Sequence, residues 1–411
     1  MHPPSPPAPP RDPPSRWHPR RRPGLLPLPD VLLRLCGART TSDDRRMVSM
    51  RDALWQGDPL GDDVVAWMLS PGEEATRRAM FERALTAGIG AVGDAGGPLS
   101  PLFRQLDVAP PWLDRGALVL GTETLLRAGR RGTYALGASS LMSGYLSSGA
   151  VKPLAATGAL ARMARRRIAE TGKFVRDVAT SGELGRFSDG FVTAVRVRIM
   201  HAIVRRSLSA SPSWRADDWG APINQSDMVG TVLEFSTAYI AGLTALGYAL
   251  SRREREAVMH VWRYVGYLLG TRDDLLPASF AEALEITRVM NETEAGPDED
   301  SRMLARALTE AWTAPSPTDP LPMRLRTAIE GRFLTGYARF LLRGRAADGL
   351  GLPDSAWSLA PLVVIPPRLC SEVAIRWSRR LRQRAVNAGR AEIEADAVTA
   401  LEGRPPTFWP R

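Results

Sequence analysis

The sequence predicts an all-α fold, and two patterns carry that prediction. From Asp63 onward, apolar residues recur at the three-to-four-residue spacing of helices over almost the whole chain. Alternating runs long enough to build a sheet are absent, and residues 362–365 (LVVI) form the one β-like tract. With 411 residues and no repeat of fixed period, the chain can form one large domain or two of ordinary size.

Start and stop signals place the predicted helices. Ser70 and Pro71 precede two glutamates, a combination typical of a helix start, and Gly88 marks the end of that helix. A long helix is predicted over residues 153–179. Further helices are predicted over residues 113–136, 138–146, 184–208, 225–250, 252–270, 278–292, 299–313, 321–345 and 371–400.

The beginning of the chain differs in composition from the rest. Twelve of the 34 prolines lie within residues 1–30, and proline lacks the amide donor that a helix or a central strand needs. We therefore expect residues 1–46 to be a disordered leader rich in Pro and Arg. An all-α domain is predicted over 47–348, and a helical C-terminal segment that packs on this domain or trails it over 349–411.

The net charge of +10 does not indicate a nucleic-acid partner. Residues 1–46 contain nine Arg against four Asp, so about half of the excess lies in the leader. The other arginines are scattered along helices, without the basic stripe interleaved with aromatic residues that nucleic-acid binding would favour. We expect no nucleic-acid binding.

Cysteine usage and hydropathy bear on the cellular location. Cys36 and Cys370 are far apart and have no Cys-x-x-Cys spacing, which excludes a cysteine zinc site, a disulfide scaffold and covalently attached c-type haem. No stretch of eighteen apolar residues is free of charges and prolines, so no transmembrane helix is predicted. A cytoplasmic protein is the simplest expectation. The alternative is export, since residues 20–22 (RRR) give the leader a faint twin-arginine character.

Histidine is scarce, which narrows the candidate chemistry. His2 and His18 lie in the leader, so His201 and His260 alone remain in the folded part. On a helix, His201 shares one face with Val197 and Val204. Motifs for a serine nucleophile elbow, a HEXXH metalloprotease and a P-loop are missing. From this helix alone, an ordinary core histidine with a hydrogen-bonded ring is the simpler interpretation of His201.

Four segments of the chain together resemble a known family. They are residues 57–62 (GDPLGD), 198–205 (RIMHAIVR), 219–227 (WGAPINQSD) and 260–270 (HVWRYVGYLLG). This combination is similar to latex-clearing-protein and MpaB-type oxygenases. The resemblance implies a globin-like helical core that encloses haem b. It also implies oxidative cleavage of a carbon–carbon double bond in a hydrophobic isoprenoid-like alkene by dioxygen.

The resemblance also assigns roles to individual residues. The proximal iron ligand of the family falls at His201, with Val197 and Val204 forming part of an apolar slot for the porphyrin. Arg198 and Arg205 lie within about one turn of His201 and are candidates to bind the haem propionates.

The side of the haem opposite His201 is expected to face a different pair. Arg167 and Thr171 share one face of a helix, and the resemblance implies that both face bound dioxygen as hydrogen-bond donors. Two departures from the family concern this side. Glu170 stands where some members have lysine, and residues 145–152 lack the acid that rubber-cleaving members use as a base.

Three other hypotheses remain open. The protein could be a haem-binding sensor or carrier without turnover, or a helical protein without haem. It could also be a non-haem iron oxygenase that uses His201 and His260, with Asp227 or Glu234 as the carboxylate ligand. Independently of these, we expect His260 to be a core residue or to support a site residue from behind, and Asn224 to be a helix N-cap. Trp219, Trp262 and Tyr264 are expected to be packing anchors.

Overall fold

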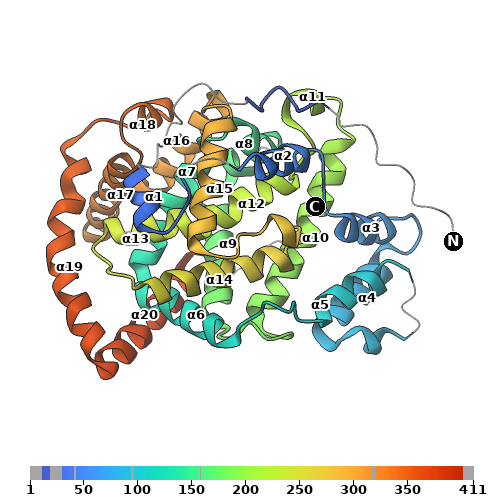
Figure 1. The fold of residues 1–411 in the computed structure, drawn as a ribbon, viewed down its shortest axis with the longest axis horizontal. Helices are drawn as coiled ribbons and strands as arrows, with labels where there is room; N and C mark the ends of the chain where they lie inside the picture. The colour runs from blue at the N-terminus through green and yellow to red at the C-terminus, as the bar shows by residue number, and fades with distance from the viewer. Residues whose placement is uncertain are drawn as a thin grey trace.

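The fold is all-α, as predicted. Within the described residues, the regular structure is helical, apart from an isolated β-bridge between Trp17 and Glu294 (Figure 1). The β-like tract at 362–365 lies inside helix α19 (Ala360–Trp377). The computed structural model describes residues 12–18, 30–40, 43–93, 97–157, 159–315 and 320–400.

Four long helices form the centre of the molecule. Both α14 and α9 pack on α6 and on α10. The approach of α6 to α14 is close, because a Cβ atom at Gly121 would lie 2.4 Å from the carbonyl oxygen of Ala257. Glycine is therefore required where these two helices meet. The four helices are α6 (Arg115–Ala135), α9 (Ala159–Thr180), α10 (Asp189–Ser209) and α14 (Arg252–Leu268).

The helix predicted over residues 225–250 is divided by a wider turn. Its first part is α12 (Gln225–Leu233) and its last part is α13 (Tyr239–Ala245), with the π-helical turn η3 (Glu234–Ala238) between them. A π turn inserts one residue into a helix and changes the direction of the side chains around it. Glu234 is the first residue of this turn, so it does not continue the pattern of α12.

The other helices surround this centre. The start predicted at Ser70 is wrong, because α4 begins at Glu74 and the Ser70 hydroxyl instead donates to the carbonyl of Ala66, 2.9 Å away. The other helices are α1 (Asp30–Leu35), α2 (Asp44–Ala53), α3 (Pro59–Met68), α4 (Glu74–Ala87), η1 (Ile89–Val92), α5 (Leu99–Asp107), η2 (Leu136–Leu141), α7 (Met142–Gly144), α8 (Ser148–Thr157), α11 (Ala216–Trp219), η4 (Asp273–Leu275), α15 (Phe280–Thr293), α16 (Glu299–Thr313), α17 (Leu321–Leu342), α18 (Gly344–Gly349), η5 (Ala356–Leu359) and α20 (Arg379–Ala400).

The predicted disorder of the leader is wrong for the parts that the structure describes. Arg16 is buried, and its guanidinium lies 2.5 Å from a carboxylate oxygen of Asp227 and 2.9 Å from one of Glu294. Trp17 is only 6% exposed, and α1 packs on α15. Proline content describes the composition of the whole leader. A single arginine that binds two buried carboxylates can nevertheless hold the residues next to it in a defined position. Residues 1–11 and 19–29 lie outside the described residues.

The chain after residue 349 packs against the core. Helix α20 lies along α6, where a Cβ atom at Gly389 would lie 1.9 Å from the carbonyl oxygen of Leu126. Helix α19 runs along the outer edge of the molecule, at the left of Figure 1. Its inner face is held by Glu372, which accepts a 2.7 Å hydrogen bond from Arg127 of α6. The predicted boundary at 348/349 falls at the end of α18.

We expect Arg16→Met to lower the free energy of unfolding by roughly 3–5 kcal/mol, because it would leave two buried carboxylates without their cation. Urea unfolding curves measure this change. The matched control is Arg326→Met, which removes an arginine whose side chain is 56% exposed and pairs with Glu330 one turn away. The control should cost less than about 0.5 kcal/mol. Equal midpoints for Arg16→Met and the wild type would contradict the packing of this segment.

Candidate active site around the His201 helix

His201 lies in the middle of α10, which is surrounded by other helices. Ser188 caps the start of α10 by accepting a hydrogen bond from the amide of Phe191. Helices α3, α9 and α14 pack around it. The imidazole of His201 is half-buried, with its Nδ1 atom inside the protein. A histidine that keeps partial access within a central helix can face a bound group.

The residues next to His201 separate into an apolar and a charged side. Val197 and Val204 lie one turn before and one turn after on one side, and both are half-buried. Arg198 and Arg205 lie on the other side, and both are buried. The two predicted apolar neighbours therefore lie on the same side of α10, next to the imidazole, and their contact with a porphyrin stays a prediction.

Both arginines bind acidic residues of the protein. Arg198 forms a bidentate ion pair with Asp58, at 2.6 and 2.7 Å, and donates a 2.8 Å hydrogen bond to Gln105. The Arg205 Nε atom lies 2.9 Å from Asp62, and its Nη1 atom donates to the carbonyl of Ile223. The predicted propionate role for these two arginines thus competes with strong internal partners, and the Arg198 side chain is only 1% exposed.

The four sequence segments that carry the family resemblance meet beside α10. The Gln225 amide donates to the carbonyls of Gly57 and Gly270, at 2.8 and 3.0 Å, and its oxygen accepts from the amide of Arg272. A Cβ atom at Gly270 would lie 2.6 Å from both the Arg198 Nε atom and the Asp58 carboxylate. We call the group formed by Asp58, Arg198, Gln225 and Gly270 the motif cluster. It fixes the position of the helix that carries His201.

The predicted oxygen-facing pair is described only in part. Thr171 is half-buried on α9, the helix that packs on α10. The Arg167 side chain lies outside the described residues. One turn after Thr171, Phe174 contacts the rings of Trp262 and Phe235, with centroids 6.1 and 6.4 Å away. The pair therefore stays a prediction, placed on a helix that does face α10.

Glu234 is an acid in an otherwise apolar helix. Protein atoms surround its carboxyl group, although part of the residue stays accessible to water. Burial, reinforced by the charge of Asp227, raises the pKa of Glu234 to about 8. The carboxyl lies against Gly144, where a Cβ atom would be 2.4 Å from its oxygen. Burial and the charge of Glu234 also raise the pKa of Tyr145.

Glu234 therefore places an acid next to the segment 145–152, which lacks one of its own. From the sequence, Glu234 is a candidate only for an iron ligand. The signal that could have found it is the single acid within the long apolar run after Asp227. Its position beside Gly144 depends on the π turn, which no local pattern predicts.

His260 has a structural role. Its Nε2 atom accepts a 2.9 Å hydrogen bond from the backbone amide of Asp114, the N-cap of α6. The ring also contacts Trp112 edge-on, at 5.7 Å between centroids. Burial lowers the pKa of His260, so the neutral ring that accepts this bond is favoured. In the described part of the chain, no group of three or more His, Cys, Asp or Glu residues is placed to hold a metal ion, which leaves the non-haem iron hypothesis without support there.

Several smaller predictions are confirmed. Asn224 is the N-cap of α12, where its side chain accepts from the amide of Asp227 at 2.9 Å. Trp262 packs against Phe235 with a centroid separation of 4.6 Å. Trp219 packs edge-on against Trp214 at 5.1 Å. These residues hold the loop before α12 and the contact between η3 and α14 in place.

Comparison with known proteins identifies the family. A sequence model described as "ER-bound oxygenase mpaB/B'/Rubber oxygenase, catalytic domain" matches residues 126–380, more than half of the chain. The chain belongs to this family. The rubber oxygenase of Streptomyces sp. (strain K30) is 25% identical over 306 residues, which are 73% of this chain and 72% of that protein. A solved structure of latex clearing protein in the closed state shares the fold, with a TM-score of 0.55 and 21% identity over 82% of this chain and 91% of that chain.

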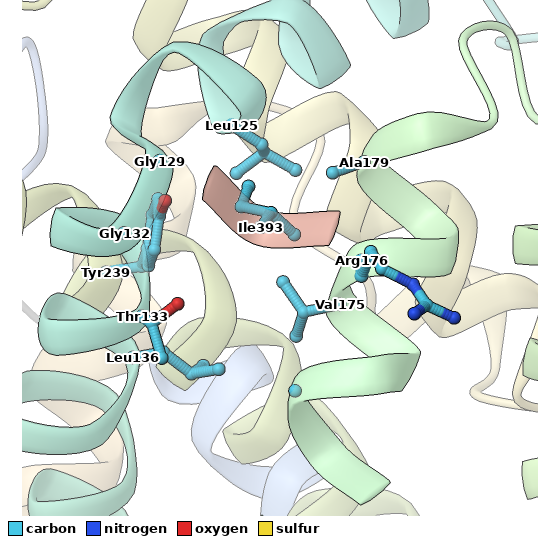
Figure 2. A pocket seen from close by; sticks show the side chains of 11 residues that line it. Leu125, Gly129, Gly132, Thr133, Leu136, Val175, Arg176, Ala179, Tyr239 and Ile393 are labelled. Atoms are coloured by element: carbon cyan, nitrogen blue, oxygen red, sulfur yellow. The ribbon is translucent and has the colours of Figure 1, made fainter. Parts of the chain in front are cut away.

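This family member also has a small pocket between α6, α9 and α20. Leu125, Val175 and Ile393 point into it, whereas the guanidinium of Arg176 points away (Figure 2). Its volume is about 30 Å³, enough for water-sized molecules and far too small for a porphyrin. The lining is mostly apolar, with Tyr239 as one of its few polar groups. None of its lining residues belongs to α10, the helix that carries His201.

We expect Asp58→Asn to destabilise the protein by roughly 3–5 kcal/mol, because Arg198 would stay buried without its counter-charge. The matched control is Asp62→Asn, which removes the partner of Arg205 but acts on a side chain that is 39% exposed. It should cost clearly less, about 1 kcal/mol. Thermal unfolding of both variants measures the difference, and similar losses would contradict the central place of the motif cluster.

The raised pKa of Glu234 predicts a pH dependence of stability. The folded protein retains a proton that the unfolded chain loses above its ordinary pKa of 4.5, so stability falls as pH rises from there to about 8. Glu234→Gln, which cannot ionise, should unfold at the same temperature as the wild type near pH 5. At pH 9 it should be more stable by on the order of 2–4 kcal/mol. Parallel melting curves for both proteins across this range would refute the raised pKa.

Proposed function

We propose that this protein is a haem b-dependent oxygenase that cleaves a carbon–carbon double bond in a hydrophobic, isoprenoid-like alkene with dioxygen. Membership of the oxygenase family supports the reaction class. The observation that carries the proposal is the half-buried His201 on the central helix α10, between Val197 and Val204. In the overall reaction the alkene double bond breaks and each carbon receives one atom of dioxygen, so two carbonyl groups form without an added reductant.

The residues around His201 provide the two features that haem binding needs, an imidazole ligand for the iron and apolar surface for the porphyrin. A neutral imidazole is a common axial ligand of haem iron, and Val197 and Val204 supply apolar surface beside it for the porphyrin. When bound, haem b would supply the redox-active iron that activates dioxygen. Arg198 and Arg205 contribute less directly, since their ion pairs with Asp58 and Asp62 fix α10 and thereby the direction of the imidazole.

The other side chains have roles in handling oxygen and protons. Thr171 on α9 carries a hydroxyl that can donate a hydrogen bond to oxygen, and Arg167 one turn earlier carries a guanidinium for the same purpose. Glu234 is protonated at neutral pH because its pKa is raised to about 8. It can therefore hold a proton in an apolar interior, close to the segment where an acid is otherwise missing.

A haem sensor or carrier without turnover is the second candidate function. The observation that favours it is the lack of an acid within residues 145–152. The two candidates differ in product formation. An oxygenase with bound haem converts a polyprenyl or terpenoid alkene into aldehydes or ketones and incorporates ¹⁸O from labelled dioxygen. A sensor consumes no alkene.

We expect the purified wild-type protein to show a Soret band in its visible spectrum, and His201→Ala to lose or shift that band, because the axial ligand is removed. His260→Ala is the matched control. It also removes a histidine, but one that contacts the N-cap of α6, so the band should be retained. A colourless wild-type protein expressed with ample haem would overturn the proposal. A band unchanged in His201→Ala would assign the ligand to another residue.

A further inference from the structure

We propose that the outer face of α19, together with the arginine-rich first turn of α20, docks the protein onto an anionic lipid bilayer. The helix would lie in the plane of the membrane surface without crossing it. This inference is independent of the haem proposal. It rests on the exposure, charge and anchoring of α19.

The outer face of α19 is apolar and exposed. Val363 is 76% exposed and Trp377 is 85% exposed, near the two ends of the helix. Soluble proteins rarely leave so many large apolar side chains of one helix in water. The exposed apolar residues on and around α19 are Leu359, Leu362, Val363, Leu369, Val373, Trp377 and Leu381.

A comparison within the same protein shows that apolar composition alone does not explain this exposure. Among the described residues, two helical stretches are long and apolar enough to cross a membrane, Gln225–Ala245 and Ala356–Trp377. The first is 67% buried inside the protein and belongs to the core. The second is only 11% buried. Its apolar side chains therefore do not serve the core, and the described residues leave most of them uncovered.

The charge around α19 indicates which partner it is. Residues 355–390 contain seven arginines and one acid, Glu372. That acid is buried and accepts from Arg127 and Arg368, so it does not offset the exposed charge. Arg379 and Arg380 are the first two residues of α20, one residue after α19 ends, and both are exposed. An apolar helix face beside a cluster of arginines is complementary to the acyl chains and phosphates of an anionic membrane.

The inner face of α19 is anchored firmly, which favours a helix lying on the surface. Arg368 stacks over the ring of Tyr248 at 3.9 Å, and Arg376 donates to the carbonyl of Ala249 at 2.9 Å. A Cβ atom at Gly247 would lie 2.7 Å from the carbonyl oxygen of Ile365. Crossing the membrane would break these contacts and the buried ion pair of Glu372. Insertion of the outer face alone breaks none of them, and Trp377 suits the interfacial depth.

A lipid surface also fits better than a second copy of the chain. A symmetric dimer with parallel α19 helices would bring the arginines at the start of α20 towards each other. An antiparallel one would offer them Asp354, an exposed acid that already pairs with Arg339, and no exposed acid within residues 355–390. An anionic membrane compensates the same charge. Docking there would bring the protein to the phase in which water-insoluble alkenes dissolve.

The first test is sedimentation of the full-length protein with vesicles. The wild type should bind vesicles of equal phosphatidylcholine and phosphatidylglycerol at least tenfold more tightly than vesicles of phosphatidylcholine alone. Val363→Glu should reduce binding at least tenfold, and each of Arg379→Gln and Arg380→Gln roughly fivefold. Val108→Glu is the matched control, because Val108 is 64% exposed on a distant loop, and it should bind like the wild type. Equal binding by Val363→Glu and the wild type would overturn the proposal.

The second test reports insertion of the apolar face directly. Cys370 is exposed on α19, so a polarity-sensitive fluorophore can be attached there after Cys36→Ser removes the other thiol. We expect its emission to shift to the blue on addition of the anionic vesicles. Binding without a shift would mean contact through the arginines only and would refute docking by α19. A wild type that ignores vesicles but dimerises, with a dimer that Val363→Glu dissociates, would assign the face to a second copy instead.

Discussion

The ion pair between Asp58 and Arg198 is the constraint on which the candidate site depends. A guanidinium that is 1% exposed is tolerated only with a carboxylate in bidentate contact, and Asp58 meets this need at 2.6 and 2.7 Å. Because Gln105, Gly270 and Gln225 pack around the same pair, helices α3, α5, α10 and α12 are joined at one point. His201 lies three residues after Arg198 on the same helix. The motif cluster therefore fixes the position of α10 along its axis and the direction in which the imidazole points.

The sequence predicted the helices well because helix periodicity is local. The ranges 113–136 and 252–270 match α6 and α14 closely, and Asn224 was found as an N-cap from its own neighbours. The partners of Arg198 and Arg205 were missed, since Asp58 and Asp62 lie about 140 residues away in the chain. Spacing on one helix shows which residues share a face, but it does not show what that face contacts. The ordered segment around Arg16 was missed for the same reason.

Glu234 shows why a missing residue in one segment does not mean a missing function in the site. The segment 145–152 contains no acid, yet the π turn that starts at Glu234 directs a carboxyl against Gly144. The absence of a side chain at Gly144 provides the room for this carboxyl. To remain protonated at neutral pH, a carboxyl group has to be buried away from water. A residue of any helix that reaches the site can meet this condition. The site therefore has to be judged from the fold, even when the family is evident from motifs.

The two long apolar helices of this protein have opposite roles, although their compositions are similar. In the first, α12 to α13, the side chains fill the core; Asp227 in its first turn pairs with Arg16, and Glu234 is desolvated. In the second, α19, the single acid faces inward to Arg127 and the apolar side chains face outward. A surface helix of a water-soluble protein usually has the opposite arrangement to α19, with charged residues facing water and apolar residues facing the core. An outward apolar face with an inward charge is the arrangement expected of a helix that contacts lipid. Helix α19 is followed by α20, and Ile393 of α20 lines the small pocket beside α9.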